Sequence, residues 1–183
     1  MKLEQLKENL PDYAKDIRLN LSNLFGNIES SGLTPTQFYG SALAIAYSLK
    51  NKALIRTLEF ESQNAGFSDL FFAAKTAATL MAMNNIYYRA IHLAENKELS
   101  AMPANLRMNG LIHHGIDKVD FELLALAVSV INGCGLCIHS HIKQLFEHAV
   151  TKIAIQSVLR LAATLNALVT AYGCADDDLN LEI

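Results

Sequence analysis

The feature that most constrains this chain is that its apolar residues recur at helical spacing along nearly the whole sequence. Residues 3–10 follow this period, and residues 13–24 resume it after a break at Pro11. Val, Ile and Thr do not alternate with polar residues over any useful length, so no β-strand is expected. The pattern therefore predicts an all-α fold.

Start and stop signals place three further helices before the middle of the chain. Thr34 is a suitable N-cap with Pro35 at the first helical position, after a loop at residues 30–32. Ser68 is expected to cap a long helix, after a break at residues 64–66. The helices predicted from these signals span residues 35–49, 51–63 and 69–94.

An internal repeat organises the chain. Residues 38–46 (FYGSALAIA) align with residues 121–129 (FELLALAVS) at an offset of 83, and residues 77–83 align with 162–168 at an offset of 85. We interpret this as two pseudo-repeated helical hairpins that pack as similar halves. The predicted single domain covers residues 1–183, with a scaffold half at 1–94, a link at 95–118 and a second half at 119–183.

Composition limits the function classes. Lys and Arg number 15 against 18 Asp and Glu, for a net charge of −3, so no basic surplus is available for nucleic acid. Uninterrupted apolar runs such as residues 123–128 are far shorter than a membrane span, and residues 1–8 do not resemble a secretory signal. The three Cys do not suggest a secreted disulfide framework, so we expect a cytoplasmic protein.

The two halves differ in chemistry. Two of the three cysteines form a Cys-x-x-Cys pair in the second half, Cys134 and Cys137. At the offset of 83 residues, Asn51 corresponds to Cys134 and Leu54 to Cys137. The first half therefore lacks whatever thiol chemistry the second half performs.

The Cys pair lies just after a turn between two apolar helical segments. Asn132 and Gly133 are turn-forming residues, so Cys134 is expected near the first turn of the following helix. Amide groups and the helix dipole favour a thiolate at that position, and Cys-x-x-Cys motifs often have lowered thiol pKa values. The segment is therefore a candidate redox site.

Helical geometry adds a histidine to this pair. At about 100° per residue, Cys137 lies about 60° from Cys134, and His141 falls between them in angle. His139 points about 140° away from Cys134 and is not included. One thiol can attack a peroxide or disulfide while the other resolves the intermediate, and His141 can move the proton.

Glu122 is the fourth candidate. It precedes Cys134 by 12 residues and belongs to the preceding helix, so the turn can bring it near the pair. We expect it to orient His141 or to relay a proton.

These residues resemble the signature of the alkyl hydroperoxide reductase AhpD family, within the carboxymuconolactone decarboxylase-like superfamily. The signature is Glu122, eleven residues, Cys134-x-x-Cys137, three residues and His141. Other segments that resemble the family are residues 6–17, 83–89 (MNNIYYR), 106–109 (LRMN) and 132–134 (NGC).

The resemblance implies an all-helical subunit, usually a homotrimer, that acts as an antioxidant thiol oxidoreductase. It implies that Cys137 is the more exposed thiol and forms the sulfenic acid or mixed disulfide, and that Cys134 resolves it and donates a proton, with Glu122 and His141 as the relay. The implied partners are an AhpC-type peroxiredoxin, a lipoylated dihydrolipoamide acyltransferase and dihydrolipoamide dehydrogenase. Dihydrolipoamide would be the electron donor, with no cofactor bound to the chain itself.

One position departs from the family pattern. Leu136 stands where members carry a His just before the second Cys. A leucine side chain can neither donate a proton nor form a hydrogen bond, so proton transfer would rest on Glu122 and His141.

Alternatives remain open. Cys134, Cys137, His141 and Glu122 could bind zinc, which would make the chain a metal-binding or interaction module without redox turnover. The two thiols could instead be buried and inert, or the fold could support decarboxylation of a cyclic acid. We interpret Cys174 as a packed thiol, and His92, His113 and His114 as loop or surface residues.

Overall fold

The structure is a computed structural model that describes residues 2–175; residue 1 and residues 176–183, the outer limits of the predicted domain, lie outside this part. Within residues 2–175 there is no β-strand, so the all-α prediction is confirmed. The α-helices are α1 (Leu3–Glu8), α2 (Lys15–Gly26), α3 (Pro35–Leu49), α4 (Lys52–Asn64), α5 (Leu70–Ala94), α6 (Lys97–Ala101), α7 (Lys118–Ile131), α8 (Gly135–Glu147) and α9 (Lys152–Gly173). Three short 3₁₀ helices lie at Asp12–Ala14, Ile28–Ser31 and Asn109–Leu111.

Local capping explains where the helices begin. Thr34 Oγ1 accepts a hydrogen bond from the Gln37 N–H at 3.2 Å, and Gln37 Oε1 accepts one from the Thr34 N–H at 3.0 Å. Helix α3 therefore starts with a capping box. The predicted cap at Ser68 is wrong: the N-cap of α5 is Asp69, whose side chain makes no capping bond. The segment predicted as a loop at residues 30–32 is partly a 3₁₀ helix. This helix ends before Gly32, whose backbone has a left-handed conformation.

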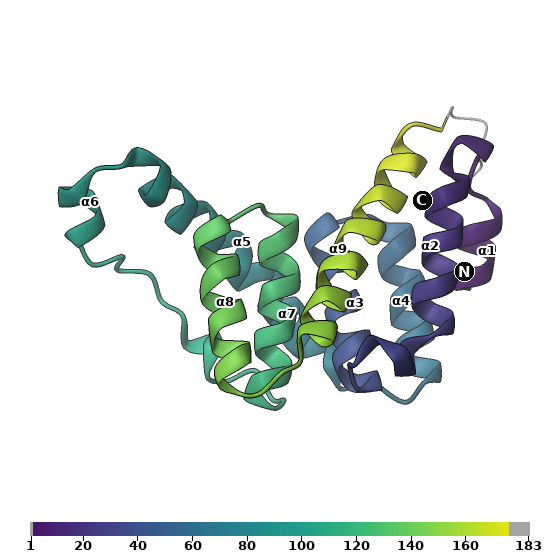
Figure 1. The fold of residues 1–183 in the computed structure, drawn as a ribbon, viewed down its shortest axis with the longest axis horizontal. Helices are drawn as coiled ribbons and strands as arrows, with labels where there is room; N and C mark the ends of the chain where they lie inside the picture. Colours follow the sequence, from purple (N-terminus) through teal and green to yellow (C-terminus); the bar gives the residue numbers. More distant parts are fainter. Residues whose placement is uncertain (1, 176–183) are drawn as a thin grey trace.

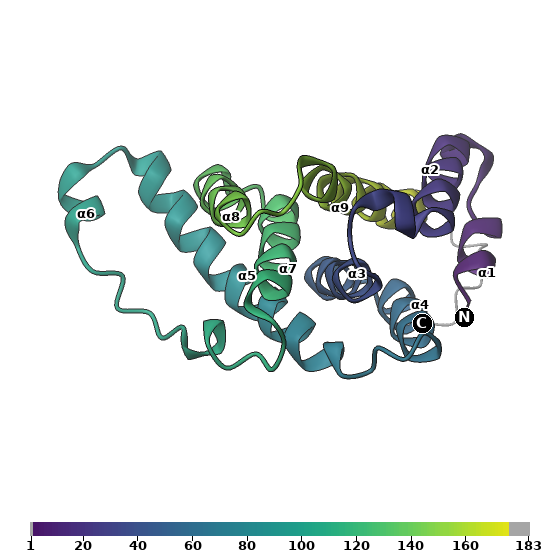
Figure 2. The ribbon, with the colours of Figure 1, turned by 60° about the horizontal axis from the view of Figure 1, so that its bottom comes forward.

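Helices α3 and α7 form the centre of the molecule. Helix α3 contacts α4, α5, α7 and α9, and α7 contacts α8 as well as α5 and α9. In Figure 2, α3 and α7 lie in the interior, with the other helices around them. Both helices are apolar on most sides because small residues alternate with Leu and Ile, which allows burial against several neighbours. Gly40 permits a close approach of α3 to α7, since a Cβ there would lie 3.0 Å from a Leu124 methyl group.

The helix bounds show the same repeat as the sequence. Shifted by 83 residues, the bounds of α4 become those of α8, and α3 overlaps α7. The two halves meet at equivalent positions: Gln37 Nε2 donates to Asp120 Oδ1 at 2.8 Å, and these residues are also 83 apart. Two similar helical hairpins are therefore packed against each other.

The link between the halves forms an arm that extends away from the body (Figures 1 and 2). The arm consists of the link, which includes helix α6, and of the C-terminal part of α5 that precedes it. Several of its apolar side chains are exposed, Leu93, Met102 and Ile112 each by more than half of their surface.

Helix α9 is the one helix of residues 2–175 that is long and apolar enough to cross a membrane by those two measures. Half of its most apolar window is buried inside the protein, where it contacts α2, α3 and α7. The Tyr13 hydroxyl also donates to the Ala171 carbonyl oxygen at 2.9 Å. The buried apolar residues of α9, such as Val158, Leu161 and Leu165, belong to the core of this fold.

Candidate active site

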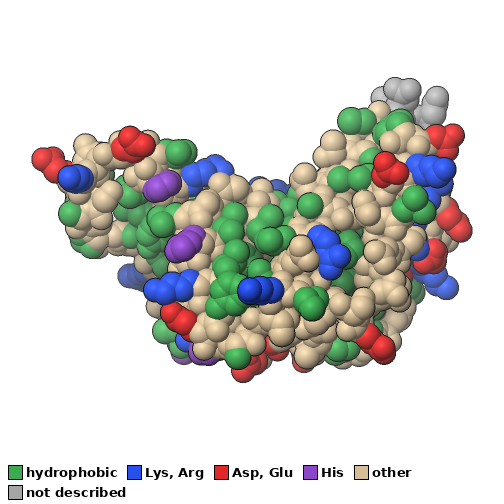
Figure 3. Space-filling view, viewed as in Figure 1, with side chains coloured by type: hydrophobic (Ala, Val, Ile, Leu, Met, Phe, Trp, Pro, Cys, Tyr) green, Lys and Arg blue, Asp and Glu red, His purple; other side chains and the backbone are tan. Residues whose placement is uncertain are grey.

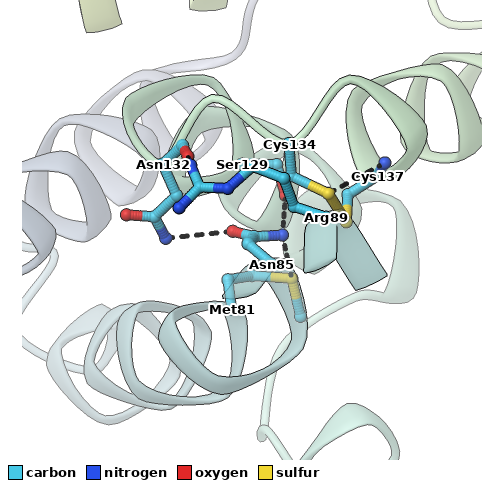
Figure 4. The surroundings of a disulfide bond; sticks show 7 residues. All are labelled: Met81, Asn85, Arg89, Ser129, Asn132, Cys134 and Cys137. Carbon is cyan, nitrogen blue, oxygen red and sulfur yellow. Dashed lines mark hydrogen bonds between the residues drawn. A yellow bond between two sulfur atoms is a disulfide. The ribbon is translucent and has the colours of Figure 1, made fainter. Parts of the chain in front are cut away.

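The Cys pair lies at the start of α8, directly after the turn that joins it to α7. Gly133 adopts a left-handed backbone conformation (φ 64°), which a glycine reaches without a Cβ clash. Cys134 is then the N-cap of α8, and its Sγ accepts the Cys137 N–H at 3.3 Å. The two sulfurs form a disulfide across a Cα–Cα distance of 5.3 Å (Figure 4). The prediction that Cys134 lies near the first turn of the following helix is therefore confirmed.

The two sulfurs differ in access. Cys134 is completely buried, whereas Cys137 retains 8% exposure and lines a cavity of about 490 Å³. Cys134 does not line that cavity. A molecule in the cavity can therefore reach the disulfide from the side of Cys137.

Glu122 and His141 form a close pair beside the disulfide. Glu122 Oε1 lies 2.6 Å from His141 Nδ1, and the two side chains are only 13% and 14% exposed. Glu122 comes from α7 and His141 from the second turn of α8, so the packing of these helices joins them. Both residues line the cavity with Cys137. The four predicted site residues are therefore brought together.

His139 points elsewhere, as its position on the helix predicts. It is exposed and lies beside Lys143 and Phe146 on the outer face of α8. It takes no part in the site.

The cavity is bounded by α5, the end of the link, α7 and α8. Its volume is within the range of small-molecule sites, and apolar side chains provide much of its wall. Leu136, 44% exposed, lines it beside Cys137, at the position where the family pattern has a His. Opposite these, Asn84 also lines it and is 5% exposed, with its buried Oδ1 making no hydrogen bond in the described structure.

A polar network behind the disulfide holds the turn. Asn85 is fully buried in α5; its Nδ2 donates to Ser129 Oγ at 2.9 Å and its Oδ1 accepts from Asn132 Nδ2 at 3.0 Å. The Arg89 guanidinium donates to the Asn132 carbonyl oxygen, and Figure 4 shows it pointing toward that residue. These contacts fix the peptide before Gly133. Sequence reasoning used residues 83–89 only for their resemblance to the family and missed this role, although two Asn and an Arg in an apolar helix are a usable signal.

His114 lies in a loop, as predicted, but it is buried rather than on the surface. It is 6% exposed, lines the cavity, and stacks on Phe121 with ring centroids 4.1 Å apart. Burial lowers the pKa of His114, and the carboxylate of Asp117 opposes this shift. Its neighbour His113 is exposed, as predicted.

Cys174 also differs from its prediction. It is exposed at the C-cap of α9 rather than packed. Among residues 2–175, no group of three or more His, Cys, Asp and Glu side chains is arranged to hold a metal ion, and the sulfurs of Cys134 and Cys137 are bonded to each other.

Comparison with known proteins gives a consistent answer. Residues 97–177 match the Carboxymuconolactone decarboxylase family, a region that includes the Cys pair. The chain is 48% identical over 166 residues to the "Alkyl hydroperoxide reductase AhpD" of Coxiella burnetii (strain Dugway 5J108-111), covering 91% of this chain and 94% of that protein.

Two further relatives with the same name extend this similarity along the chain. That of Bradyrhizobium sp. (strain BTAi1 / ATCC BAA-1182) is 47% identical over 175 residues, covering 96% of this chain and 95% of the relative. That of Rhodopseudomonas palustris (strain BisB18) is 44% identical over 179 residues, covering 98% and 97%. With the Cys pair, the Glu122–His141 contact and the all-α fold, this similarity over nearly the full length means that the chain belongs to the alkyl hydroperoxide reductase AhpD family.

Proposed function

We propose that this protein is an antioxidant thiol-disulfide oxidoreductase with alkyl hydroperoxidase activity. Its Cys134–Cys137 pair would take electrons from a lipoyl dithiol and pass them to an AhpC-type peroxiredoxin or to an organic hydroperoxide. The observation that carries the proposal is that Cys137 and the Glu122–His141 pair line one cavity, whereas Cys134 is buried behind Cys137.

The reductive half-reaction starts from the disulfide. A thiolate of dihydrolipoamide attacks Cys137 Sγ, a mixed disulfide forms, and Cys134 leaves as a thiolate. The Cys137 N–H and the N-terminus of α8 stabilise that buried thiolate. The second lipoyl thiol then attacks the lipoyl sulfur of the mixed disulfide, which releases lipoamide and leaves two reduced cysteines.

The oxidative half-reaction uses Cys137 as nucleophile. Its thiol loses a proton to His141, the thiolate attacks the terminal oxygen of the hydroperoxide, and the O–O bond breaks. The proton held by His141 passes to the departing alkoxide, which leaves as an alcohol. Glu122 keeps His141 oriented through the contact at Nδ1. Cys134 then attacks the sulfenic acid on Cys137, and water leaves as the disulfide reforms.

The partners follow from this cycle. The peroxiredoxin would be reduced by thiol-disulfide exchange at Cys137, and the electrons would come from NADH through dihydrolipoamide dehydrogenase and a lipoylated acyltransferase. The relatives' name supports an alkyl hydroperoxide as the final acceptor. The proposed site of action is the cytoplasm.

We further propose that the subunit assembles as a homotrimer. The arm exposes Leu93, Met102 and Ile112 at 71%, 62% and 77%, and a single subunit gives them little to pack against. Figure 3 shows hydrophobic side chains gathered on the face over α7 and α8. Helix α8 also exposes Leu136 and Phe146, at 44% and 47%. Apolar surface of this extent is typical of interaction sites. Light scattering at several protein concentrations would measure the mass of the particle.

The function is tested by NADH oxidation in a mixture of dihydrolipoamide dehydrogenase, lipoamide, this protein and cumene hydroperoxide. We expect turnover with the wild type and with Cys174→Ser, whose residue is remote from the cavity, and none with Cys137→Ser. Absence of wild-type turnover, both alone and with an AhpC-type peroxiredoxin, would overturn the proposal.

A further inference from the structure

The proposed cycle gives no role to several polar groups of the cavity, and His114 is one of them. Cys137, Glu122 and His141 have roles in electron or proton transfer, whereas the imidazole of His114 lines the same cavity without one. It comes from the link rather than from a helix of the Cys hairpin. Only 6% of the residue is exposed, so its polar edge is shielded from bulk water.

The surroundings of His114 fix its orientation and its tautomer. One face of the ring lies on Phe121, at an interplanar angle of 11°, directly before Glu122 in α7. The Ile116 N–H donates to His114 Nδ1 at 3.4 Å. A neutral ring with an acceptor at Nδ1 carries its proton at Nε2. The remaining polar edge of the ring is therefore a hydrogen-bond donor.

The charge state is consistent with a donor that does not give up its proton. Burial lowers the pKa of His114 more strongly than Asp117 raises it, which favours the neutral ring at neutral pH. A neutral imidazole can stabilise a developing oxyanion by hydrogen bonding, as in other enzymes that use a buried histidine in this way.

On these grounds we propose that His114 binds the hydroperoxide: its Nε2–H donates a hydrogen bond to the oxygen that becomes the departing alkoxide when Cys137 is oxidised. The inference rests on the proposed function and adds a substrate-binding residue to it. The bonds that form and break are unchanged: S–O forms, O–O breaks, and the proton on the alcohol comes from the Cys137 thiol through His141. His114 keeps its own proton throughout.

Leu136 shows why such a donor is needed here. It lies next to Cys137 on the wall of the same cavity and has no polar atom in its side chain. His114, on the same cavity, can therefore supply the hydrogen bond that position 136 cannot. Because Leu136 is 44% exposed, a polar side chain of similar size fits there without disturbing the core.

The test separates the two half-reactions. The His114→Phe variant keeps an aromatic ring on Phe121 but removes the donor. In stopped-flow measurements, the reduced variant should react with cumene hydroperoxide about 10- to 100-fold more slowly than the wild type, the cost of one hydrogen bond to a developing charge. Reduction of its disulfide by dihydrolipoamide should keep the wild-type rate, because that step has no departing oxygen. The matched control is His113→Phe, at the exposed neighbouring histidine, which should behave as the wild type in both steps.

A second variant guards against a purely structural effect. Leu136→His in the His114→Phe background returns an imidazole to the same cavity and should recover at least part of the hydroperoxide rate. Equal losses in both half-reactions, or a wild-type hydroperoxide rate in His114→Phe, would overturn the role of His114. If the reduced wild type itself does not react with hydroperoxide, the proposed peroxidase activity fails first, which distinguishes the two failures.

Discussion

The two helical hairpins, α3–α4 and α7–α8, use one backbone design for different purposes. In each hairpin, the residue before the N-cap of the second helix has a left-handed backbone conformation. This residue is Lys50 before α4, at φ 58°, and Gly133 before α8, at φ 64°. The caps themselves are Asn51, whose Oδ1 accepts the Leu54 N–H at 2.9 Å, and Cys134, whose Sγ accepts the Cys137 N–H at 3.3 Å. A structural cap in the first half thus corresponds to a sulfur of the Cys134–Cys137 disulfide in the second.

The comparison teaches that the cap geometry is not what makes the second hairpin a redox candidate. At the position of Glu122, the first half has Tyr39, which stacks on Phe67 and has its pKa raised mainly by burial. The first hairpin thus lacks the carboxylate partner. The cavity beside Cys137 is bounded by α5, the link, α7 and α8, and no residue of α3 or α4 lines it. The neighbours of the cap, more than the cap, distinguish the halves.

The most severe way to break this comparison is to move the Cys pair. In a variant with Cys134→Ser, Cys137→Ser, Asn51→Cys and Leu54→Cys, the new cysteines occupy the equivalent cap and third helical positions. We expect them to form a disulfide, detected by mass mapping, but to support no NADH-coupled hydroperoxide turnover. The reason is that no Glu–His pair or cavity adjoins them. Turnover above a tenth of the wild-type rate would contradict the view that the surroundings decide.

A smaller loss should follow from removing the carboxylate that the first half lacks. Glu122→Gln should lower the hydroperoxide rate of the reduced protein about 100-fold, the lower end of what positioned acid–base groups contribute. The matched variant, Tyr39→Phe at the equivalent position of the first half, keeps the ring stacked on Phe67 and should leave the rate unchanged. Equal rates in the two variants would remove Glu122 from the mechanism.

The turn residues sharpen the comparison through stability. Gly133→Ala should cost about 1–2 kcal/mol from left-handed backbone strain alone, since its Cβ would meet nothing closer than the Arg89 guanidinium at 3.7 Å. Lys50→Gly should instead stabilise the protein by up to about 1 kcal/mol, because glycine adopts the left-handed region without strain. Urea unfolding of the two variants measures both changes. A destabilised Lys50→Gly would mean that the Lys50 side chain contributes more than its backbone costs.

The smallest effect concerns the contact between the halves, Gln37 to Asp120. Burial raises the pKa of Asp120, the Gln37 bond lowers it and Asp117 raises it. Because the carboxyl pKa of Asp120 is raised in the folded state, the contribution of this group to the free energy of unfolding is highest at low pH. That contribution declines as the pH rises through the raised pKa. Asp120→Asn should remove this decline, with a gain at pH 7 below about 1 kcal/mol for a half-buried group.

The experiment is urea unfolding of wild type and Asp120→Asn between pH 4 and pH 7. Gln37→Ala is the matched variant from the other half, and it should make the decline with pH steeper because it removes the bond that favours the carboxylate. A stability difference between wild type and Asp120→Asn that does not vary with pH would contradict this account.

Local patterns were sufficient for much of the fold. The helical period, the cap at Thr34 and the turn at Asn132 and Gly133 depend on residues a few positions apart, and each is found where it is expected. The cap at Ser68 is the exception: its side chain makes no capping bond, and Asp69 is the N-cap. A capping residue type indicates a helix start only to within a residue or so.

The candidate site was predictable to the same degree. Cys134, Cys137 and His141 share a helical face by spacing alone, and Glu122 could be placed nearby because one short turn joins its helix to theirs. Periodicity cannot distinguish the two sulfurs in exposure, since both lie in the same turn of one helix. Their difference arises from the cavity wall, to which α5 and the link contribute.

What the sequence by itself determined is therefore the helical class, the repeated hairpins and the Cys-x-x-Cys motif with its partner residues, because these depend on short-range spacing. Only the tertiary structure decided that Cys137 faces a cavity, that Asn85 and Arg89 hold the turn behind it, that His114 is buried in the wall, and that Cys174 is exposed. Burial and cavity lining are set by contacts between helices distant in sequence. Those contacts depend on how the whole set of helices packs, which no local pattern encodes.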